Sequence, residues 1–254
     1  MRKRLNPTLL TLLVALIAGT IVMVRLVMTA PTPTELYVRQ YAREQGISFR
    51  AYPKSLITLL ESNPETESFV LNYPFREEES INMSDLDCKD GVPLMLQWDS
   101  RWGYLTYGDD FAAVTGCGPM CLSMAGWYLT GDARFSPDRL FAFADENGYY
   151  SKGNGSKWTL ISEGAPALGL TVMELPLVEQ TILNYLKNGE LIIAIMGEGD
   201  FTTSGHYILI TDVQEGMLVI RDPNSIINSE KLWDYNVFAS QVRNLWLIQA
   251  NPLS

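Results

Sequence analysis

The sequence predicts an α+β fold, in which a group of helices precedes an antiparallel sheet. Segments that end at glycines, as helices often do, occupy the chain up to about residue 189. From residue 191 onward, apolar and alternating segments are separated by a short turn, which is typical of strands. Helices grouped before strands indicate an α+β architecture.

Four helices are expected in the middle of the chain. The first should begin at Cys117 and stop at Gly131, because glycine readily adopts the left-handed conformation that ends a helix. Ser136 and Pro137 form an N-cap followed by proline at the first helical position. The four expected helices cover residues 117–129, 137–148, 156–168 and 178–188.

The strands are expected mainly in the last quarter of the chain. Residues 191–196 form a continuous apolar run, and residues 206–213 alternate after His206. Glu215-Gly216 then forms a turn, so that residues 217–221 return beside the preceding strand as a hairpin. The remaining expected strands cover residues 92–97, at the entry to the domain, and 245–249.

Upstream of these elements, the sequence predicts a membrane segment and two helices. Residues 7–30 are apolar apart from a few threonines and Arg25, and they follow Arg2-Lys3-Arg4, as in a transmembrane anchor with its positive end inside. A cleaved signal peptide is the alternative, but Pro31 after Ala30 makes a poor cleavage site. Either interpretation places the rest of the chain outside the cytoplasm. The two further helices are expected over residues 34–47 and 52–63.

These features divide the chain into three predicted regions. Residues 1–30 form the cytoplasmic tip and anchor, residues 31–90 a linker and helical juxtamembrane region, and residues 91–254 the catalytic domain. The net charge of the chain is −10. Residues 31–254 carry −14, with 15 basic and 29 acidic side chains, so we expect no nucleic-acid partner.

Cys117 and His206 are the strongest candidates for a catalytic pair. Cys117 lies in Gly116-Cys117-Gly118-Pro119, at the expected start of a helix, where unpaired N–H groups and the helix dipole favour thiolate over thiol. His206 is the only histidine in the chain and opens the predicted hairpin. A neutral imidazole beside the thiol would accept its proton and later protonate a leaving amine.

The other two cysteines have weaker claims to chemistry. Cys121 lies one turn into the expected helix among apolar residues, and Cys88 has no activating neighbour. A disulfide between them is compatible with the sequence but is not established by it. With one histidine and no paired cysteine ligands, we expect no zinc site and no other cofactor.

Asp222 is the first candidate to orient His206, because the hairpin returns it beside the histidine. A carboxylate bonded to the far imidazole nitrogen would fix the tautomer and stabilise the imidazolium form. Asn224 and Asp212 are the alternatives. Asp222 also has a purely structural interpretation, as a turn residue before Pro223.

Several motifs, in this order, resemble the C39-like cysteine peptidases, relatives of the bacteriocin-processing endopeptidases. They are Pro93-Leu94-Met95-Leu96-Gln97-Trp98-Asp99, Arg101-Trp102-Gly103, Tyr107-Gly108, Gly116-Cys117-Gly118-Pro119, Ser123-Met124-Ala125, Gly205-His206-Tyr207 and Asp222-Pro223-Asn224. Tyr52-Pro53 and residues 69–74 are similar to a membrane-anchored bacterial branch.

The resemblance implies a papain-like fold, with a helix bearing Cys117 packed on a sheet bearing His206. It also implies a Cys–His–Asp site in which Gln97 stabilises the oxyanion. Met120 departs from the pattern, since the family often has threonine there; this leaves the nucleophile intact and alters the cleft wall.

The sequence therefore predicts a membrane-anchored, extracellular cysteine peptidase with catalytic Cys117, His206, Asp222 and Gln97. Its expected partners are a peptide or protein substrate, with a cell-wall peptide as one candidate, and the membrane. Two other hypotheses stay open: an inactive binding module on a peptidase fold, and an acyl-transfer enzyme in which an amine rather than water accepts the acyl group.

Overall fold

The computed structural model describes residues 8, 15–18, 20, 30–77 and 79–251, and it contains two compact units. The first unit spans residues 1–51 and the second spans residues 52–254. The anchor predicted over residues 1–30 lies mostly outside the described residues. Among the residues that are described, we find no helix with the length and apolar character needed to cross a membrane.

The first unit contains α2 (Pro33–Glu44), which the sequence predicted over nearly the same residues. Thr32 caps it, with its hydroxyl accepting a hydrogen bond from the Glu35 amide at 3.2 Å. Arg39 on this helix stacks its guanidinium on the Phe49 ring, 4.0 Å from the ring centroid. This cation–π contact joins the helix to the short 3₁₀ helix η1 (Phe49–Ala51) that follows it.

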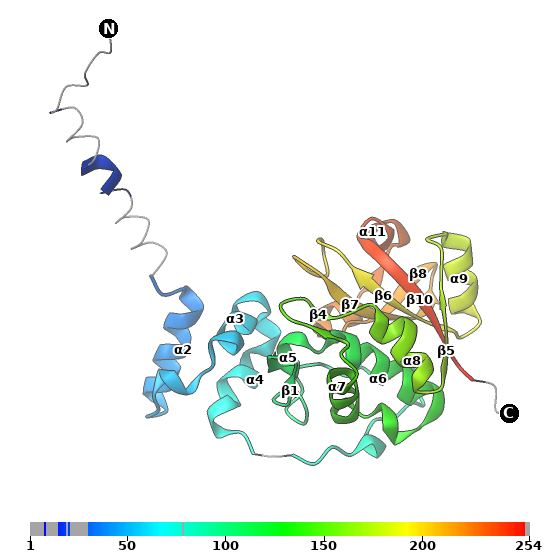
Figure 1. The fold of residues 1–254 in the computed structure, drawn as a ribbon, viewed down its shortest axis with the longest axis horizontal. Helices are drawn as coiled ribbons and strands as arrows, with labels where there is room; N and C mark the ends of the chain where they lie inside the picture. Colours follow the sequence, from blue (N-terminus) through cyan, green and yellow to red (C-terminus); the bar gives the residue numbers. More distant parts are fainter. Residues whose placement is uncertain (1–7, 9–14, 19, 21–29, 78, 252–254) are drawn as a thin grey trace, which may run out of the picture. The chain divides into compact units, whose positions relative to one another are not determined.

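The second unit is built on a six-stranded antiparallel sheet with the order β5-β10-β6-β7-β8-β9 (Figure 1). The predicted hairpin is confirmed: β7 and β8 are joined at Glu215 and Gly216, both of which have positive φ. The strands are β5 (Leu170–Glu174), β6 (Leu191–Met196), β7 (His206–Gln214), β8 (Met217–Arg221), β9 (Leu232–Trp233) and β10 (Val242–Ala250).

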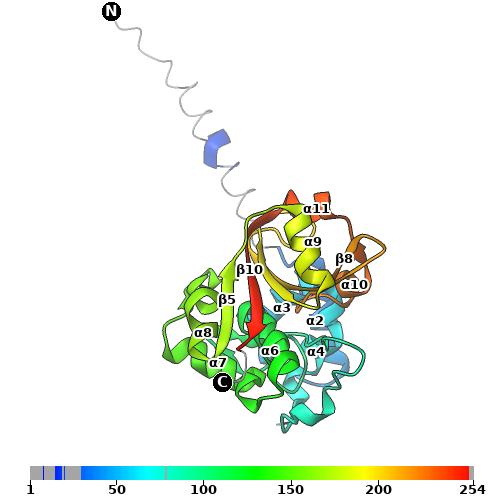
Figure 2. The same ribbon diagram turned by 90° about the vertical axis from the view of Figure 1, so that its right-hand side faces the viewer.

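Both faces of this sheet are covered, which explains why the β6 segment is apolar throughout. Ile193 and its odd-numbered neighbours pack into one core cluster with α6 (Cys117–Thr130). Ile192 and its even-numbered neighbours pack into a second cluster with α9 (Glu179–Lys187). Successive side chains of a strand point to opposite faces, so a strand buried on both sides shows no alternation. Figure 1 shows α6 and α9 on opposite sides of β10, and Figure 2 shows β5 beside β10.

The helix predictions are largely confirmed, and α6 carries the first residue of the candidate site. It starts at Cys117 and is followed by Gly131 at φ +63°. The expected helix at 156–168 begins late, because Ser156 pairs with Tyr150 in a short hairpin and helical structure starts at Leu160. The other helical elements of the second unit include α3 (Lys54–Ser62), α4 (Glu67–Asn72), α5 (Ala112–Thr115), α7 (Pro137–Glu146), η6 (Leu160–Gly164), α8 (Ala165–Ala167), α10 (Ile226–Glu230) and α11 (Tyr235–Ala239).

The strand predicted over residues 92–97 is wrong. Its backbone groups bond to turns and side chains instead of a neighbouring strand: the Val92 carbonyl accepts from Arg221 Nε at 2.9 Å, and the Gln97 amide donates to the Pro223 carbonyl at 2.7 Å. Its apolar character still reflects burial, since Met95 is fully enclosed. Two short hairpins were not predicted, β1 (Thr106–Tyr107) with β2 (Asp110–Phe111) and β3 (Tyr150–Ser151) with β4 (Gly155–Ser156).

Residues 52–75, upstream of the predicted catalytic domain, pack as part of the second unit. Leu56 and Val70 are fully buried, and the Phe69 ring stacks on Tyr104 with 4.1 Å between centroids. The Tyr104 hydroxyl donates to the Phe69 carbonyl at 2.7 Å.

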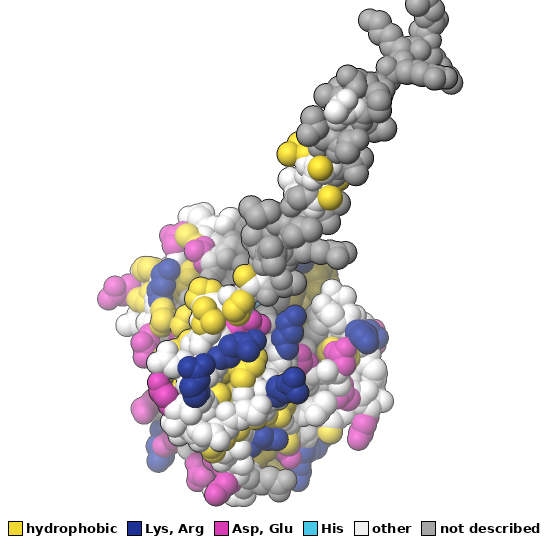
Figure 3. Space-filling model, turned by 90° about the vertical axis from the view of Figure 1, so that its left-hand side faces the viewer, with side chains coloured by type: hydrophobic (Ala, Val, Ile, Leu, Met, Phe, Trp, Pro, Cys, Tyr) yellow, Lys and Arg dark blue, Asp and Glu magenta, His cyan; other side chains and the backbone are white. Residues whose placement is uncertain are grey.

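On the face that Figure 3 presents, basic and acidic side chains are both exposed, so the net negative charge does not produce a uniformly acidic surface.

Candidate active site

Cys117 is the first residue of α6, where the helix leaves its first N–H groups without helical partners. Gly116 ends α5 and brings the chain directly into α6. Burial alone would raise the pKa of the partly exposed Cys117 thiol. Hydrogen bonding to His206, the charge of that imidazole and the amides of Tyr207 and Gly118 reverse this, so the pKa lies below its ordinary value.

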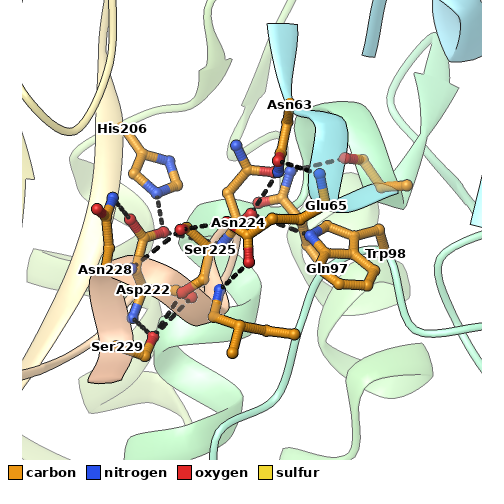
Figure 4. Close-up of polar contacts among 12 residues, drawn as sticks. Asn63, Glu65, Gln97, Trp98, His206, Asp222, Asn224, Ser225, Asn228 and Ser229 are labelled. Carbon is orange, nitrogen blue, oxygen red and sulfur yellow. Dashed lines mark hydrogen bonds and ion pairs between the residues drawn. The ribbon is translucent and has the colours of Figure 1, made fainter. Parts of the chain in front are cut away.

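His206 is the first residue of β7 and is paired in register with Met196 of β6. Its Nε2 lies 2.6 Å from Asp222 Oδ1 (Figure 4). Burial lowers the pKa of His206, but the charge and hydrogen bond of Asp222, with a smaller contribution from Cys117, raise it to about 10. Because Nε2 is held by Asp222, Nδ1 is the nitrogen that can exchange a proton with the thiol.

Asp222 follows β8 directly and is 1% exposed. Its Oδ1 accepts from His206 and from the Asn224 amide at 2.8 Å, while Oδ2 accepts from Asn228 Nδ2 at 2.8 Å. Asp212, an alternative orienting residue, is exposed on the hairpin and accepts a bond from the Val213 amide. The structure thus brings Asp222, rather than Asp212, to the imidazole.

Asn224, the other alternative, lies in the same cleft but does not replace Asp222 at His206. Its carbonyl accepts from Asn63 Nδ2 at 2.6 Å and from Trp98 Nε1 at 3.0 Å. Its amide supports the Asp222 carboxylate, as described above. Asn224 therefore helps to hold the Asp222 carboxylate in place and does not itself orient His206.

Gln97 is buried and lines the same cleft as Cys117 and His206. Its Nε2 donates to the Ala113 carbonyl at 2.7 Å, and its Oε1 has no hydrogen-bond partner among the described residues. An amide nitrogen carries two hydrogens, so one N–H of Gln97 is left for a further acceptor. Gln97, Cys117 and His206 thus line one cleft, and Asp222 lies buried next to His206.

The cleft has a volume of about 760 Å³ and two walls that sequence reasoning missed. One is the loop at 199–205, which precedes His206. The other is α3, which contributes Ser55, Thr58 and Ser62. Spacing of three and four residues places these hydroxyls on one side of the helix, away from buried Leu56 and Leu60. That polar stripe was the available signal, but it did not reveal which part of the protein it faces.

Three buried titratable groups that interact with Cys117 remain neutral at ordinary pH. Tyr107, Tyr207 and Cys121 interact electrostatically with Cys117, and burial raises the pKa of each. Asp222 is therefore the charged group that acts most directly on the pair. All three cysteines are free thiols, and the described residues contain no cluster of three or more His, Cys, Asp or Glu side chains placed to hold a metal ion.

The sequence model of the Peptidase C39-like family matches residues 89–252. This is more than half of the chain, and the protein belongs to that family. The mixed helix-and-sheet fold described above agrees with this membership. No curated protein matches the chain.

Solved structures similar to this chain include three C39 peptidase domains or C39-like proteins. The peptidase domain of Streptococcus ComA, a bifunctional ABC transporter involved in quorum sensing, is 19% identical over 59% of this chain and 99% of its own, with a TM-score of 0.42. The Streptococcus mutans ComA peptidase domain in complex with a small-molecule inhibitor is 20% identical over 58% and 98%, with a TM-score of 0.36. A Bacillus anthracis protein described as C39-like is 16% identical over 65% and 98%, with a TM-score of 0.39.

Proposed function

We propose that the protein is a cysteine peptidase that hydrolyses a peptide bond through Cys117, His206, Asp222 and Gln97. The observation that carries this proposal is that Cys117, at the start of a helix, and His206 line one cleft, with His206 held by Asp222 at 2.6 Å. A nucleophile, a base and a group that orients the base define the machinery of covalent acyl transfer. Family membership supports the same reaction class.

The proposed reaction begins with the Cys117 thiolate adding to the substrate carbonyl carbon. One N–H of Gln97 and the backbone N–H of Cys117 stabilise the resulting oxyanion. His206 then gives its proton to the amine as the C–N bond breaks, leaving a thioester on Cys117. The neutral imidazole takes a proton from water, the hydroxide adds to the thioester, and the thiolate leaves as the carboxylate product forms.

Asp222 keeps the imidazole in place throughout this sequence. Its hydrogen bond to Nε2 fixes the tautomer that presents Nδ1 to Cys117, and its charge stabilises the imidazolium formed with the thiolate. The lowered pKa of Cys117 and the raised pKa of His206 both favour the thiolate–imidazolium pair, which is the form that attacks the substrate.

We also propose that this peptidase is tethered to the membrane by an N-terminal anchor and acts outside the cytoplasm. Support comes from the apolar, acid-free character of residues 7–30 after a basic tip. A peptide cross-link of the cell wall is one candidate substrate, since an anchored domain of this kind would face the wall.

The pH dependence of kcat/KM is expected to be bell-shaped. Below the lowered pKa of Cys117 the nucleophile is protonated, and above the pKa of His206, about 10, the imidazolium that protonates the leaving amine is lost. The plateau should therefore extend through neutral pH to the alkaline side. Initial rates on a peptide library at several pH values measure the profile; a single rise near the ordinary thiol pKa of about 8.5, with no alkaline fall, would contradict it.

Replacing Gln97 by alanine is expected to lower kcat by about 10²–10³-fold with a smaller change in KM, as for other lost oxyanion donors. The reason is that this N–H is needed most when charge develops on the carbonyl oxygen. Steady-state kinetics measure the effect, and an unfolding temperature close to the wild-type value would show that the lost bond to Ala113 has not disrupted the fold. An unchanged kcat would remove Gln97 from the mechanism.

A further inference from the structure

A hydrogen-bonded clasp joins residues 63–65 to the segment that carries Asp222. Asn63 Nδ2 donates to the Asn224 carbonyl at 2.6 Å. The Glu65 carboxylate accepts from Ser225 Oγ at 2.5 Å and from the Ile226 amide at 2.8 Å, and its Oε2 also accepts from the Ile227 amide at 3.2 Å. Glu65 thereby caps the first turn of α10 from a position 160 residues away in sequence.

The segment held by this clasp supplies most of the bonds that fix Asp222. The Asn224 amide and Asn228 Nδ2 donate to its two carboxylate oxygens, each at 2.8 Å. Ser229 Oγ accepts from the Asp222 amide at 2.9 Å and donates to the Ser225 carbonyl at 2.7 Å. Figure 4 shows this network between Glu65 and His206, with Asp222 next to the histidine. The partners of Asp222 in this network all lie within residues 224–229.

We propose that Glu65 is a positioning residue of the active site, which acts through the 224–229 segment to hold Asp222 against His206. This inference rests on the proposed function. It assigns a role to residues that precede the family match at 89–252, so the residues of the family domain alone do not complete the site. Glu65 lines neither the cleft nor the Cys117 side chain, and it acts on the site through the segment that holds Asp222.

Residues 52–75, which carry Glu65, are packed too closely against the rest of the second unit to act as a detachable cover over the cleft. Leu59 and Leu60 of α3 and Phe69 of α4 are buried, and Phe69 stacks on Tyr104. Thr66 is also fully buried and donates to the Asn63 carbonyl at 2.7 Å, which holds the turn that presents Glu65. Residues 52–75 therefore pack as an integral part of the second unit.

The test measures alkylation of Cys117 by iodoacetamide across pH in the full-length protein, which needs no substrate. Cys88→Ala is the common background, so that labelling reports the site. Glu65→Ala is expected to lower the rate at mildly acidic pH about tenfold, because a looser Asp222 stabilises the imidazolium less and the thiolate forms at higher pH. Glu65→Gln retains one acceptor oxygen and should fall between wild type and alanine. Glu61→Ala, at an exposed position of α3, removes the same charge and should behave as wild type.

A double-mutant comparison separates positioning from a general structural effect. In an Asp222→Ala background, Glu65→Ala should cause no further loss of the alkylation rate, because its route to the imidazole is already gone. An equal loss in both backgrounds, or a Glu65→Ala profile identical to wild type, would overturn the positioning role. If wild-type Cys117 itself labels only near pH 8.5, the proposed function fails rather than this inference. Thermal unfolding of each variant identifies any rate change that is caused by loss of the fold. If Glu65→Ala does not fold, the alkylation rate of Glu65→Gln is compared with that of the wild type instead.

Discussion

Replacing Cys117 by alanine is expected to abolish peptide hydrolysis, with a fall in kcat of about 10⁴-fold or more. No other thiol can take its place. Cys121 is fully buried, with a pKa raised well above the ordinary value by burial and by Cys117. Cys88 is not part of the cleft, and its pKa is also raised, first by burial and then by Asp87. The measurement is product formation from a peptide library, followed by mass spectrometry.

The matched control for this variant is Cys88→Ala, which also removes a partly exposed thiol but leaves the site intact. It should retain wild-type kcat and KM. Trapping provides a second readout, since wild-type protein and substrate should form a thioester detectable as a mass increase, and Cys117→Ala should form none. Hydrolysis by Cys117→Ala at the wild-type rate would show that Cys117 is not the nucleophile.

Replacing His206 by alanine is expected to lower kcat/KM about 10²–10⁴-fold, the usual contribution of a positioned acid–base group. Two functions disappear together: the positive charge that stabilises the thiolate, and the proton donor for the leaving amine. His206 is the only histidine in the chain, so no neighbouring imidazole can substitute. The loss should be greatest for amide substrates and smaller for activated esters, whose leaving groups need no protonation.

Comparison of an amide with an ester of the same acyl group measures this difference directly. A proportional loss on both substrates would indicate that His206 only maintains the structure around Cys117. Replacement of Asp222 by alanine should lower kcat/KM on the two substrates in the same sense as His206→Ala. The loss should be smaller, because the imidazole itself remains.

Local signals in the sequence predicted the elements that carry Cys117 and His206. A glycine at each end predicted the bounds of α6, and the Glu215-Gly216 turn predicted the hairpin of β7 and β8. The hairpin in turn explains why Asp222 was identified: an antiparallel partner that ends at residue 221 returns the chain to the start of β7. These features depend on residues that are close together in sequence.

The features that were missed depend on tertiary partners. Residues 92–97 resemble a strand because they are apolar, yet their backbone bonds to Arg221 and Pro223, which no local pattern indicates. The position of α3 in the cleft wall and the contact of Glu65 with α10 likewise depend on residues that are far apart in sequence. Proline and threonine around Glu65 indicate a turn, but they do not identify the segment that the turn contacts.

The most direct test of the central claim is the rate of Cys117 alkylation by iodoacetamide across pH, in wild type and in His206→Ala, both in the Cys88→Ala background. The account predicts rapid labelling of the wild type at mildly acidic pH and loss of that labelling in His206→Ala, because the imidazolium holds the thiolate. Labelling that rises only near the ordinary thiol pKa of about 8.5, and is the same in both proteins, would contradict the catalytic pair and favour a binding module on a peptidase fold.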